Sequence, residues 1–316
     1  MGDATKGQRG NPHMTQQGEL ERQSLVLDEV EAGAWIRDGM TVALGGFITS
    51  SHPMALVRQI IRNGVRDLTI IGAASSGLDV DVLIGAGCVR KVISPYVGAE
   101  TLAPIGPFFR AAAERGEIQV WEIDEAMFYV GLRAAAQLLP FLPWRGLVGT
   151  SYPEVNPDLK VFADPIKGER LIAVPPIAPD VTLIHAAAAD AYGNVQHHGT
   201  GFGDRALHLA SDRTIVEVER VLPNQEVRKD PLKTSLWEVD AVIRAPYGAH
   251  PYSSPGFYVE DCEHIREYAA AAQAYTRLGD RGPFQGYLER YVLGPATHAD
   301  YLERIGIKRL LGLNEY

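Results

Sequence analysis

Cysteine and long apolar runs are scarce in this 316-residue chain, and basic residues are outnumbered by acidic ones. Its two cysteines, Cys88 and Cys262, form no C-x-x-C pair, which argues against a disulfide framework or a cysteine zinc site and favours a reduced, cytoplasmic compartment. No apolar run approaches the roughly 20 residues that span a bilayer. With 39 acidic and 30 basic side chains, the net charge of −9 argues against nucleic-acid binding, because phosphate contacts need clustered Lys and Arg.

The chain does contain enough apolar residues for a large folded core. Apolar residues make up 46% of the chain and charged residues 22%, as in ordinary globular proteins. The length allows two domains or one large α/β unit. Residues 1–20 are polar and lack a signal-peptide apolar region, so we interpret them as a disordered tag or N-terminal extension, with Met14 as a hypothetical native start. We interpret residues 21–316 as one domain.

Helical and strand patterns alternate along the first half of the chain. Apolar residues at helical spacing predict a helix over residues 24–37, and a short buried strand follows at 41–44. Pro53 is expected at the first position of the next helix, where its missing N–H costs nothing. The further elements expected are strands at 68–71, 89–93 and 118–122 and helices at 80–86, 108–115 and 125–139.

The second half adds strands and a helical tail. The expected strands lie near 170–174, 181–186, 213–218 and 239–244, and the tail begins at about 264, with helical segments at 269–274 and 287–292. Residues 150–169 are expected to form a long surface excursion. The alternation predicts an α/β fold with an open, mostly parallel sheet and helices on both faces. The carboxyl ends of parallel strands meet at one edge, which is the expected ligand crevice.

Two loops of small residues follow strands at this expected crevice. Segment 45–51 (GGFITSS) lies between a strand and a helix, where glycines let the backbone approach a ligand and the helix N-terminus offers free N–H groups. It equally fits a tight turn, and it matches neither common nucleotide-binding fingerprint. Segment 73–77 (AASSG) fits a ligand floor or a loop in which small size alone matters.

Charged and titratable residues elsewhere leave several interpretations open. Glu122, Asp124 and Glu125 open an Ala-rich helix, where they complement the helix dipole or supply a general base if burial raises a pKa. The histidines lack the i, i+4 spacing of a helical zinc pair, so no metal site is expected. His197 and His198 adjoin a Gly-rich segment and fit either a loop near a ligand or a solvated turn.

Several motifs together resemble the A subunit of glutaconate CoA-transferase, a family I CoA-transferase. They are VALGGF at 42–47, DLT at 67–69, DVLIGAG at 81–87, AAA at 134–136, LPFLP at 139–143, DAV at 240–242, APYGAHP at 245–251 and DYL at 300–302. Each motif is weak alone, but the ordered set is fairly specific. The likeness runs from about residue 25 to 313.

The resemblance implies an α/β fold of the CoA-transferase, NagB-like type. It also implies a B subunit of similar fold, an A₂B₂ heterotetramer and an active site between A and B. In that family the nucleophilic glutamate belongs to the B subunit, where it forms covalent intermediates. Coenzyme A is then a substrate and not a bound cofactor, and this chain supplies the acyl pocket. The substrate-binding residues expected from the two loops are Gly45, Gly46, Phe47, Ser50, Ser51, Ala74, Ser75 and Ser76.

The segment around Glu125 resembles a second branch more closely. EIDEAM at 122–127 and GLRAAAQ at 131–137 are similar to the A subunit of steroid ring-opening CoA hydrolases, in which a glutamate at the matching position is catalytic. In this alternative Glu125 is the base for hydrolytic carbon–carbon cleavage of a cyclic acyl-CoA. Met127 and Phe128 nearby fit a wide apolar substrate or the core. A decarboxylase of the same fold and a subunit without chemistry of its own remain further alternatives.

Overall fold

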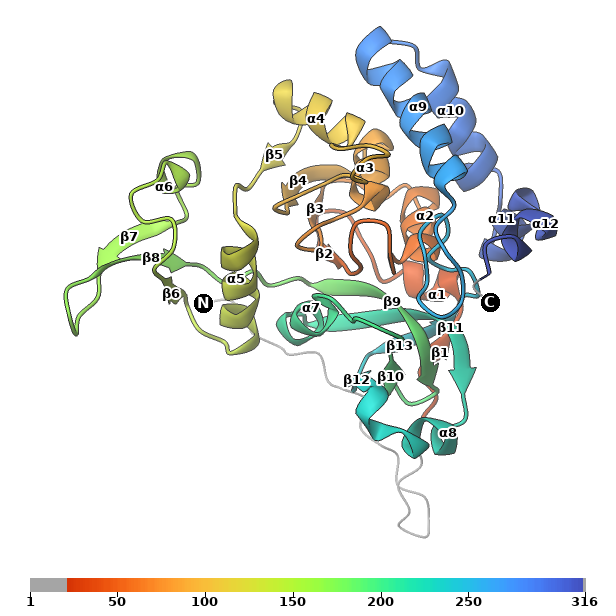
Figure 1. Cartoon of the computed structure of the whole chain (residues 1–316), viewed down its shortest axis with the longest axis horizontal. Coiled ribbons are helices and arrows are strands. Elements are labelled where there is room, and N and C mark those ends of the chain that lie inside the picture. Colours follow the sequence, from red (N-terminus) through yellow and green to blue (C-terminus); the bar gives the residue numbers. More distant parts are fainter. Residues whose placement is uncertain (1–21, 315–316) are drawn as a thin grey trace.

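The computed structural model describes residues 22–314, so the predicted extension at 1–20 lies outside the described residues. Within the described part, a ten-stranded sheet forms the centre of the molecule (Figure 1). Its strands are β1 (Val26–Leu27), β2 (Thr41–Leu44), β3 (Leu68–Ile71), β4 (Val89–Ile93), β5 (Gln119–Val120), β9 (Val181–Asp190), β10 (Val195–Gln196), β11 (Arg213–Leu222), β12 (Thr234–Leu236) and β13 (Ala241–Arg244).

The order of the strands places a switch point near the middle of the sheet. The order is β1-β13-β11-β9-β2-β3-β4-β5, and every neighbouring pair along it is parallel. Strand β10 pairs antiparallel with β9 and with β12. The chain adds strands in one direction from β2 and in the other from β9, so the order reverses between these two strands. Open α/β sheets bind ligands beside such a reversal, outside the carboxyl ends of the strands.

Helices cover both faces of the sheet (Figure 1). Helices α2 to α4 pack on one face with α9 and α10 outside them, and α5 and α7 pack together on the other face. The helices are α1 (Glu29–Gly33), α2 (Met54–Arg62), α3 (Leu78–Gly85), α4 (Pro107–Glu114), α5 (Glu125–Ala136), α6 (Tyr152–Val155), α7 (Asp204–Ala210), α8 (Asn224–Lys229), α9 (Cys262–Leu278), α10 (Gly282–Leu288), α11 (His298–Ile305) and α12 (Ile307–Leu311), with a 3₁₀ turn at Pro231–Lys233 and a π-helical turn at Glu289–Leu293.

Strand β2 shows why this sheet is buried on both sides. Val42 and Leu44 join the core that includes α2 and α3, whereas Ala43 between them joins the core that includes α5. All three side chains are fully buried, as expected for a parallel strand with apolar residues on both faces. The predicted fold class, an open and mostly parallel sheet with helices on both faces, is confirmed.

The helix predicted over residues 24–37 is wrong at both ends. Val26 pairs with Val242, so the first residues of this segment form edge strand β1. Helix α1 begins only after Asp28, which caps it by accepting the N–H of Val30 (2.9 Å). Pairing with a strand from the far end of the chain overrides the local helical spacing.

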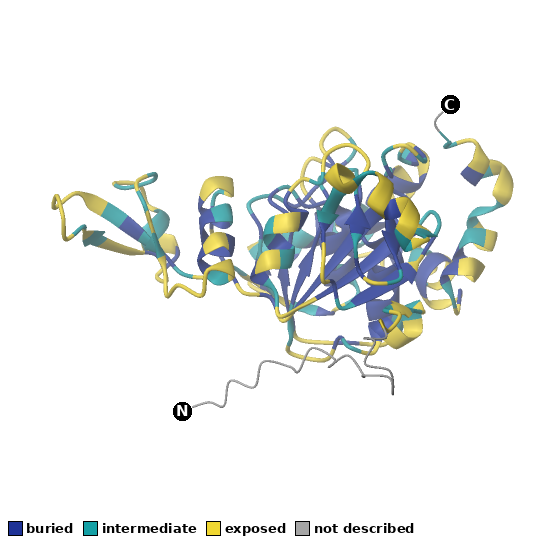
Figure 2. Ribbon diagram, turned by 90° about the horizontal axis from the view of Figure 1, so that it is seen from below, coloured by how far each residue is buried: buried dark blue, intermediate teal, exposed yellow. Residues whose placement is uncertain are grey.

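Residues 150–169 lie at the surface as predicted, but they contain regular elements that the sequence did not indicate. This stretch contains α6 and β7 (Lys160–Ala163), and β7 joins β6 (Leu142–Trp144) and β8 (Arg170–Val174) in a three-stranded antiparallel sheet. The small sheet stands beside the main sheet, next to α5 (Figures 1 and 2). Buried Ile172 and Val174 of β8 pack with side chains of α5, and this core holds the small sheet against the rest of the protein.

The remaining predicted elements are present with shifts at their ends. The helix predicted over 125–139 ends at Ala136, because Leu138 adopts a φ of +56° that helices do not allow. Pro53 precedes the first turn of α2 instead of opening it. Both cysteines are free thiols. Among residues 22–314, no helix is long and apolar enough to cross a membrane.

Candidate active site

Segment 45–51 lies at the switch point between β2 and β9. The Gly45 N–H donates to the Leu183 carbonyl of β9 (2.8 Å), which holds the loop against that strand just beyond β2. Gly46 has a φ of +99°, and a Cβ there would lie 2.8 Å from the Ser50 carbonyl oxygen. A side chain does not fit this turn, so the position requires glycine.

The structure joins this loop to the second predicted loop, 73–77. The Ile48 N–H donates to the Ser75 carbonyl (2.8 Å), and a Cβ on Gly77 would lie 2.7 Å from the Ile48 carbonyl oxygen. Ile48 has a φ of +51°, a strained value for a β-branched residue of the kind that clusters at functional sites. The loops after β2 and β3 therefore form one continuous surface.

The predicted substrate-binding residues differ in accessibility. Three of them, Phe47, Ser50 and Ser75, are half-buried. The other five are buried, namely Gly45, Gly46, Ser51, Ala74 and Ser76. The Ser76 hydroxyl turns inward and donates to the Ala73 carbonyl (3.1 Å). A substrate can contact the half-buried side chains directly, and the residues behind them shape the backbone.

A buried contact joins the helices that follow the two loops. His52 Nδ1 and Asp79 Oδ2 lie 2.8 Å apart, and both residues are fully buried. His52 comes just before α2, and Asp79 lies in the first turn of α3. No sequence motif connects His52 to Asp79, which lies 27 positions further along the chain.

The residues that lead into α7 pack against the glycine loop. Asp204, the first residue of α7, is fully buried, and its Oδ1 accepts the Gly46 N–H (3.0 Å). The Phe202 ring stacks on the Phe47 ring with centroids 4.9 Å apart, and Phe202 remains partly exposed. An aromatic pair and a buried carboxylate therefore fix the position of the glycine loop.

His197 has partners at both ring nitrogens. Its Nε2 lies 2.9 Å from Asp204 Oδ2, and its Nδ1 lies 2.6 Å from the Ser235 hydroxyl. Its neighbour His198 is exposed and stacks on Phe257. His197 is thus bound to the residue that holds the glycine loop, and the Ser235 contact had no signal in the sequence.

Glu125 lies at the edge of the same region. Asp124 caps α5 by accepting the Met127 N–H (2.7 Å), and Glu125 is exposed in the first turn. Burial, followed by the carboxylates of Glu125 and Asp204, raises the pKa of Tyr129 one turn further along. Glu125 therefore lies within electrostatic range of the side of α5 that meets α7.

Met127 and Phe128, the residues after this first turn, belong to the core and not to the crevice. Their side chains are 0% and 1% exposed and pack with Trp121 and Val174. Of the two interpretations that the sequence left open for them, the structure selects core packing.

A buried charged cluster supports the start of α2. Burial alone lowers the pKa of His185, but hydrogen bonds to Glu217 (3.2 Å) and Glu219 (3.1 Å) outweigh this effect and raise it to about 9. Glu217 also accepts the N–H of Leu56 (3.0 Å) in the first turn of α2, where Pro53 provides no side-chain cap. This cluster anchors the helix directly behind the glycine loop.

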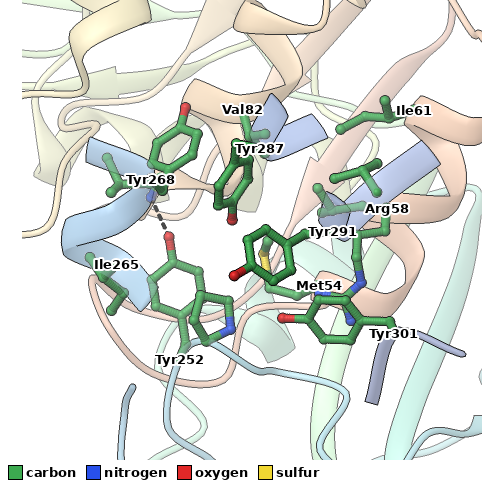
Figure 3. A pocket seen from close by; sticks show the side chains of 14 residues that line it. Met54, Arg58, Ile61, Val82, Tyr252, Ile265, Tyr268, Tyr287, Tyr291 and Tyr301 are labelled. Carbon is green, nitrogen blue, oxygen red and sulfur yellow. Dashed lines mark hydrogen bonds between the residues drawn. The ribbon is translucent and has the colours of Figure 1, made fainter. Parts of the chain in front are cut away.

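A small cavity is lined by residues outside the two loops and is too small to bind an acyl group. It lies between α2, α3 and the C-terminal helices (Figure 3), with Tyr252, Tyr268, Tyr287 and Tyr291 among its walls. The Tyr252 hydroxyl accepts the Leu78 N–H (2.6 Å) there. Its free volume is about 20 Å³. This accommodates roughly one water molecule and no acyl group.

The chemistry available at the crevice is binding and acid–base chemistry. Half-buried hydroxyls and an aromatic pair can hold an acyl chain, and Glu125 supplies an exposed carboxylate at the edge. Among the described residues, no group of three His, Cys, Asp or Glu side chains is arranged to hold a metal ion.

Comparison with known proteins identifies the family. The family model described as "Coenzyme A transferase" matches residues 29–245. The A chain of glutaconate CoA-transferase from Acidaminococcus fermentans is 33% identical over 297 residues, which cover 88% of this chain and 91% of that protein. The crystal structure of that enzyme superimposes with a TM-score of 0.86 at 32% identity, covering 93% of this chain and 96% of that one.

Two further relatives carry different descriptions. The cholesterol ring-cleaving hydrolase IpdA subunit of Mycobacterium tuberculosis is 34% identical over 282 residues, covering 86% of this chain and 93% of that protein. An uncharacterized protein of Archaeoglobus fulgidus is 38% identical over 275 residues, 86% of this chain, and the match spans 60% of its length.

Proposed function

Because the chain belongs to the coenzyme A transferase family, we propose that it is the A subunit of a heteromeric enzyme that moves CoA between carboxylic acids. The partner is a B subunit, in an A₂B₂ assembly with the active site between A and B. A glutamate of B attacks the acyl-CoA carbonyl, forms an acyl-glutamyl anhydride and releases CoA thiolate. The thiolate then attacks the glutamyl carbonyl, so the thioester energy is kept while the first acid leaves.

The joined loops at the switch point carry this proposal. The Ile48–Ser75 hydrogen bond (2.8 Å) aligns the two loops side by side at the sheet edge where α/β proteins bind ligands. Phe47 offers apolar surface, and the Ser50 and Ser75 hydroxyls offer hydrogen bonds to an acyl group. Coenzyme A is a substrate in this reaction, and no bound cofactor takes part.

Glu125 favours a second candidate, hydrolytic cleavage of a carbon–carbon bond in a cyclic acyl-CoA. Its exposed carboxylate, which contributes to the raised pKa of Tyr129, supports a role as a general base on water or on a β-keto thioester. The relative named as a ring-cleaving hydrolase supports this candidate, because its sequence identity to this chain is similar to that of the transferase relative.

Product analysis of the complex with its B subunit distinguishes the reactions. The complex is incubated with an acyl-CoA, with and without a second carboxylic acid, and the CoA esters are separated by liquid chromatography and mass spectrometry. We expect a new acyl-CoA that forms only when the second acid is present.

If a ring-opened CoA ester forms without an acceptor acid, the enzyme is a hydrolase and not a transferase. If the acyl-CoA loses carbon dioxide and keeps its CoA, the enzyme is a decarboxylase, and both candidate reactions are contradicted. Full activity of this chain without any B subunit would contradict the shared active site.

A further inference from the structure

A serine, a histidine and an aspartate form a connected chain beside the glycine loop. The Ser235 hydroxyl lies 2.6 Å from His197 Nδ1, and His197 Nε2 lies 2.9 Å from Asp204 Oδ2. We propose that these residues form a serine acyl-transfer site that hydrolyses carboxylic esters and thioesters, separately from CoA transfer. The assignment rests on the geometry and the role of each group, the criteria by which such triads are recognised across unrelated folds.

The surroundings of Asp204 determine the protonation of His197. Asp204 is fully buried, and its Oδ1 accepts the Gly46 N–H (3.0 Å). In the carboxylate form its Oδ2 is also an acceptor and can take the N–H of His197. The Ser235 hydroxyl has a second acceptor within reach, the Val195 carbonyl (3.3 Å). We assign the Nε2 proton of His197 to the bond with Asp204, which leaves the Nδ1 lone pair to accept from the Ser235 hydroxyl. This is the state in which an imidazole removes a proton from serine.

A β-bulge directs the serine toward the histidine. In the pairing of β10 with β12, Val195 faces Leu236 and Gln196 faces Thr234, so Ser235 has no partner residue in this ladder. Bulges occur beside active sites, where they redirect a side chain out of the regular ladder. Ser235 is half-buried and the nearby Trp237 is 39% exposed, so the serine lies close to the protein surface.

The reaction proceeds in two balanced steps. Ser235 Oγ attacks the carbonyl carbon of the ester or thioester while its proton moves to His197 Nδ1. The bond to the leaving alkoxide or thiolate breaks, and His197 returns the proton to it. Water then attacks the acyl-serine, His197 takes its proton and passes it to Ser235 Oγ, and the carboxylic acid leaves. Water is the only co-reactant.

This inference stands apart from the proposed CoA transfer. Transfer uses a glutamate of the B subunit to accept the acyl group, whereas all three groups of the serine site belong to this chain. Hydrolysis at Ser235 is therefore expected without the partner, and a fluorophosphonate reacts with an activated serine and not with a carboxylate.

The test treats the full chain with an ethyl fluorophosphonate probe and locates the adduct by peptide mass spectrometry. Hydrolysis of p-nitrophenyl acetate is measured in parallel on the same protein. We expect the adduct on Ser235, and we expect Ser235→Ala and His197→Gln to reduce hydrolysis by about 100-fold or more.

Two matched variants serve as controls. Ser211→Ala removes a half-buried hydroxyl that bonds to Thr182, and His198→Gln removes the adjacent histidine. Both should hydrolyse the ester within about twofold of the wild type. Ser235→Cys replaces the hydroxyl by a thiol at the same position. We expect this thiol to react with iodoacetamide faster than Cys88 or Cys262 does.

An adduct on another residue, or none, would overturn the inference. Wild-type hydrolysis in folded Ser235→Ala would overturn it as well. Equal iodoacetamide reactivity of all three thiols in Ser235→Cys would show that His197 does not activate this position.

Discussion

The two candidate reactions give Glu125 different roles. In CoA transfer it borders the acyl pocket, and in ring opening it removes a proton or activates water. Its side chain is exposed in the first turn of α5, where Asp124 already provides the cap. Removing its charge therefore tests chemistry without removing a buried contact.

The first prediction is that Glu125→Gln keeps its fold and most of its CoA transfer in the complex with B. We expect kcat/KM for transfer to fall by less than about tenfold, because the nucleophile of the proposed transfer is a glutamate of B. Glu122→Gln, which removes another exposed carboxylate just before α5, is the control. A loss of about 1,000-fold or more in Glu125→Gln alone would assign the catalytic base to this residue.

The second prediction concerns His185, which lies between Glu217 and Glu219. Its pKa of about 9 exceeds the usual histidine value of 6.5, so its stabilising contribution is complete below pH 6.5 and is lost as pH rises toward 9. We expect the wild type to lose on the order of 3 kcal/mol of unfolding free energy across this window relative to His185→Gln.

Urea unfolding at a series of pH values between about 6 and 9.5 measures this difference. His198→Gln is the control, since partial desolvation of this largely exposed ring and nearby cations lower the pKa of His198, and it is neutral over most of the window. Parallel stability curves for the wild type and His185→Gln would contradict the raised pKa.

At the level of elements, the crevice depends on how closely the loops after β2 and β3 approach. Gly77, which caps α3, has a φ of −87°, so its backbone does not require positive φ. A Cβ there would nevertheless lie 2.7 Å from the Ile48 carbonyl oxygen and 2.9 Å from His52 Nε2. The space between the loops is therefore filled, and the close contact itself calls for glycine.

The third prediction is that Gly77→Ala separates the two loops. We expect a loss of about 1–3 kcal/mol in stability, as for other overpacked sites, together with a higher KM for the acyl-CoA. Gly286→Ala is the control, because nothing lies within 4 Å of a Cβ at that helical position. Unchanged stability and unchanged KM in Gly77→Ala would show that the loops tolerate separation.

The sequence predicted the regular elements better than the contacts between them. Strand–helix alternation and the small residues at 45–51 and 73–77 were enough to place both loops at one sheet edge. The His52–Asp79 and His197–Ser235 contacts could not be predicted, because they join residues that share no local pattern. Strand β1 was missed for the same reason, since its partner Val242 lies far away in the sequence.

At the level of the whole molecule, apolar side chains remain exposed around the small sheet. Leu138 is 78% exposed, Ile166 is 89% exposed and Phe141 is 41% exposed. All three lie within or beside the segment that contains β6, β7 and β8. Large apolar side chains that are this exposed occur on surfaces that another protein covers.

The fourth prediction is that the chain associates with itself when it is produced alone. We expect homodimers or larger species in light scattering, and a defined heteromer when B is produced with it. A stable monomer at every concentration, in the absence of B, would contradict self-association through these exposed apolar residues.

The central claim is that this chain shares a CoA-transfer site with a B subunit. The most direct measurement is mass spectrometry of the co-purified complex after incubation with acyl-CoA and trapping with borohydride or hydroxylamine. Our account predicts a modified glutamate on B and none on this chain. Turnover to a ring-opened or decarboxylated CoA product, with no covalent adduct on either protein, would contradict it.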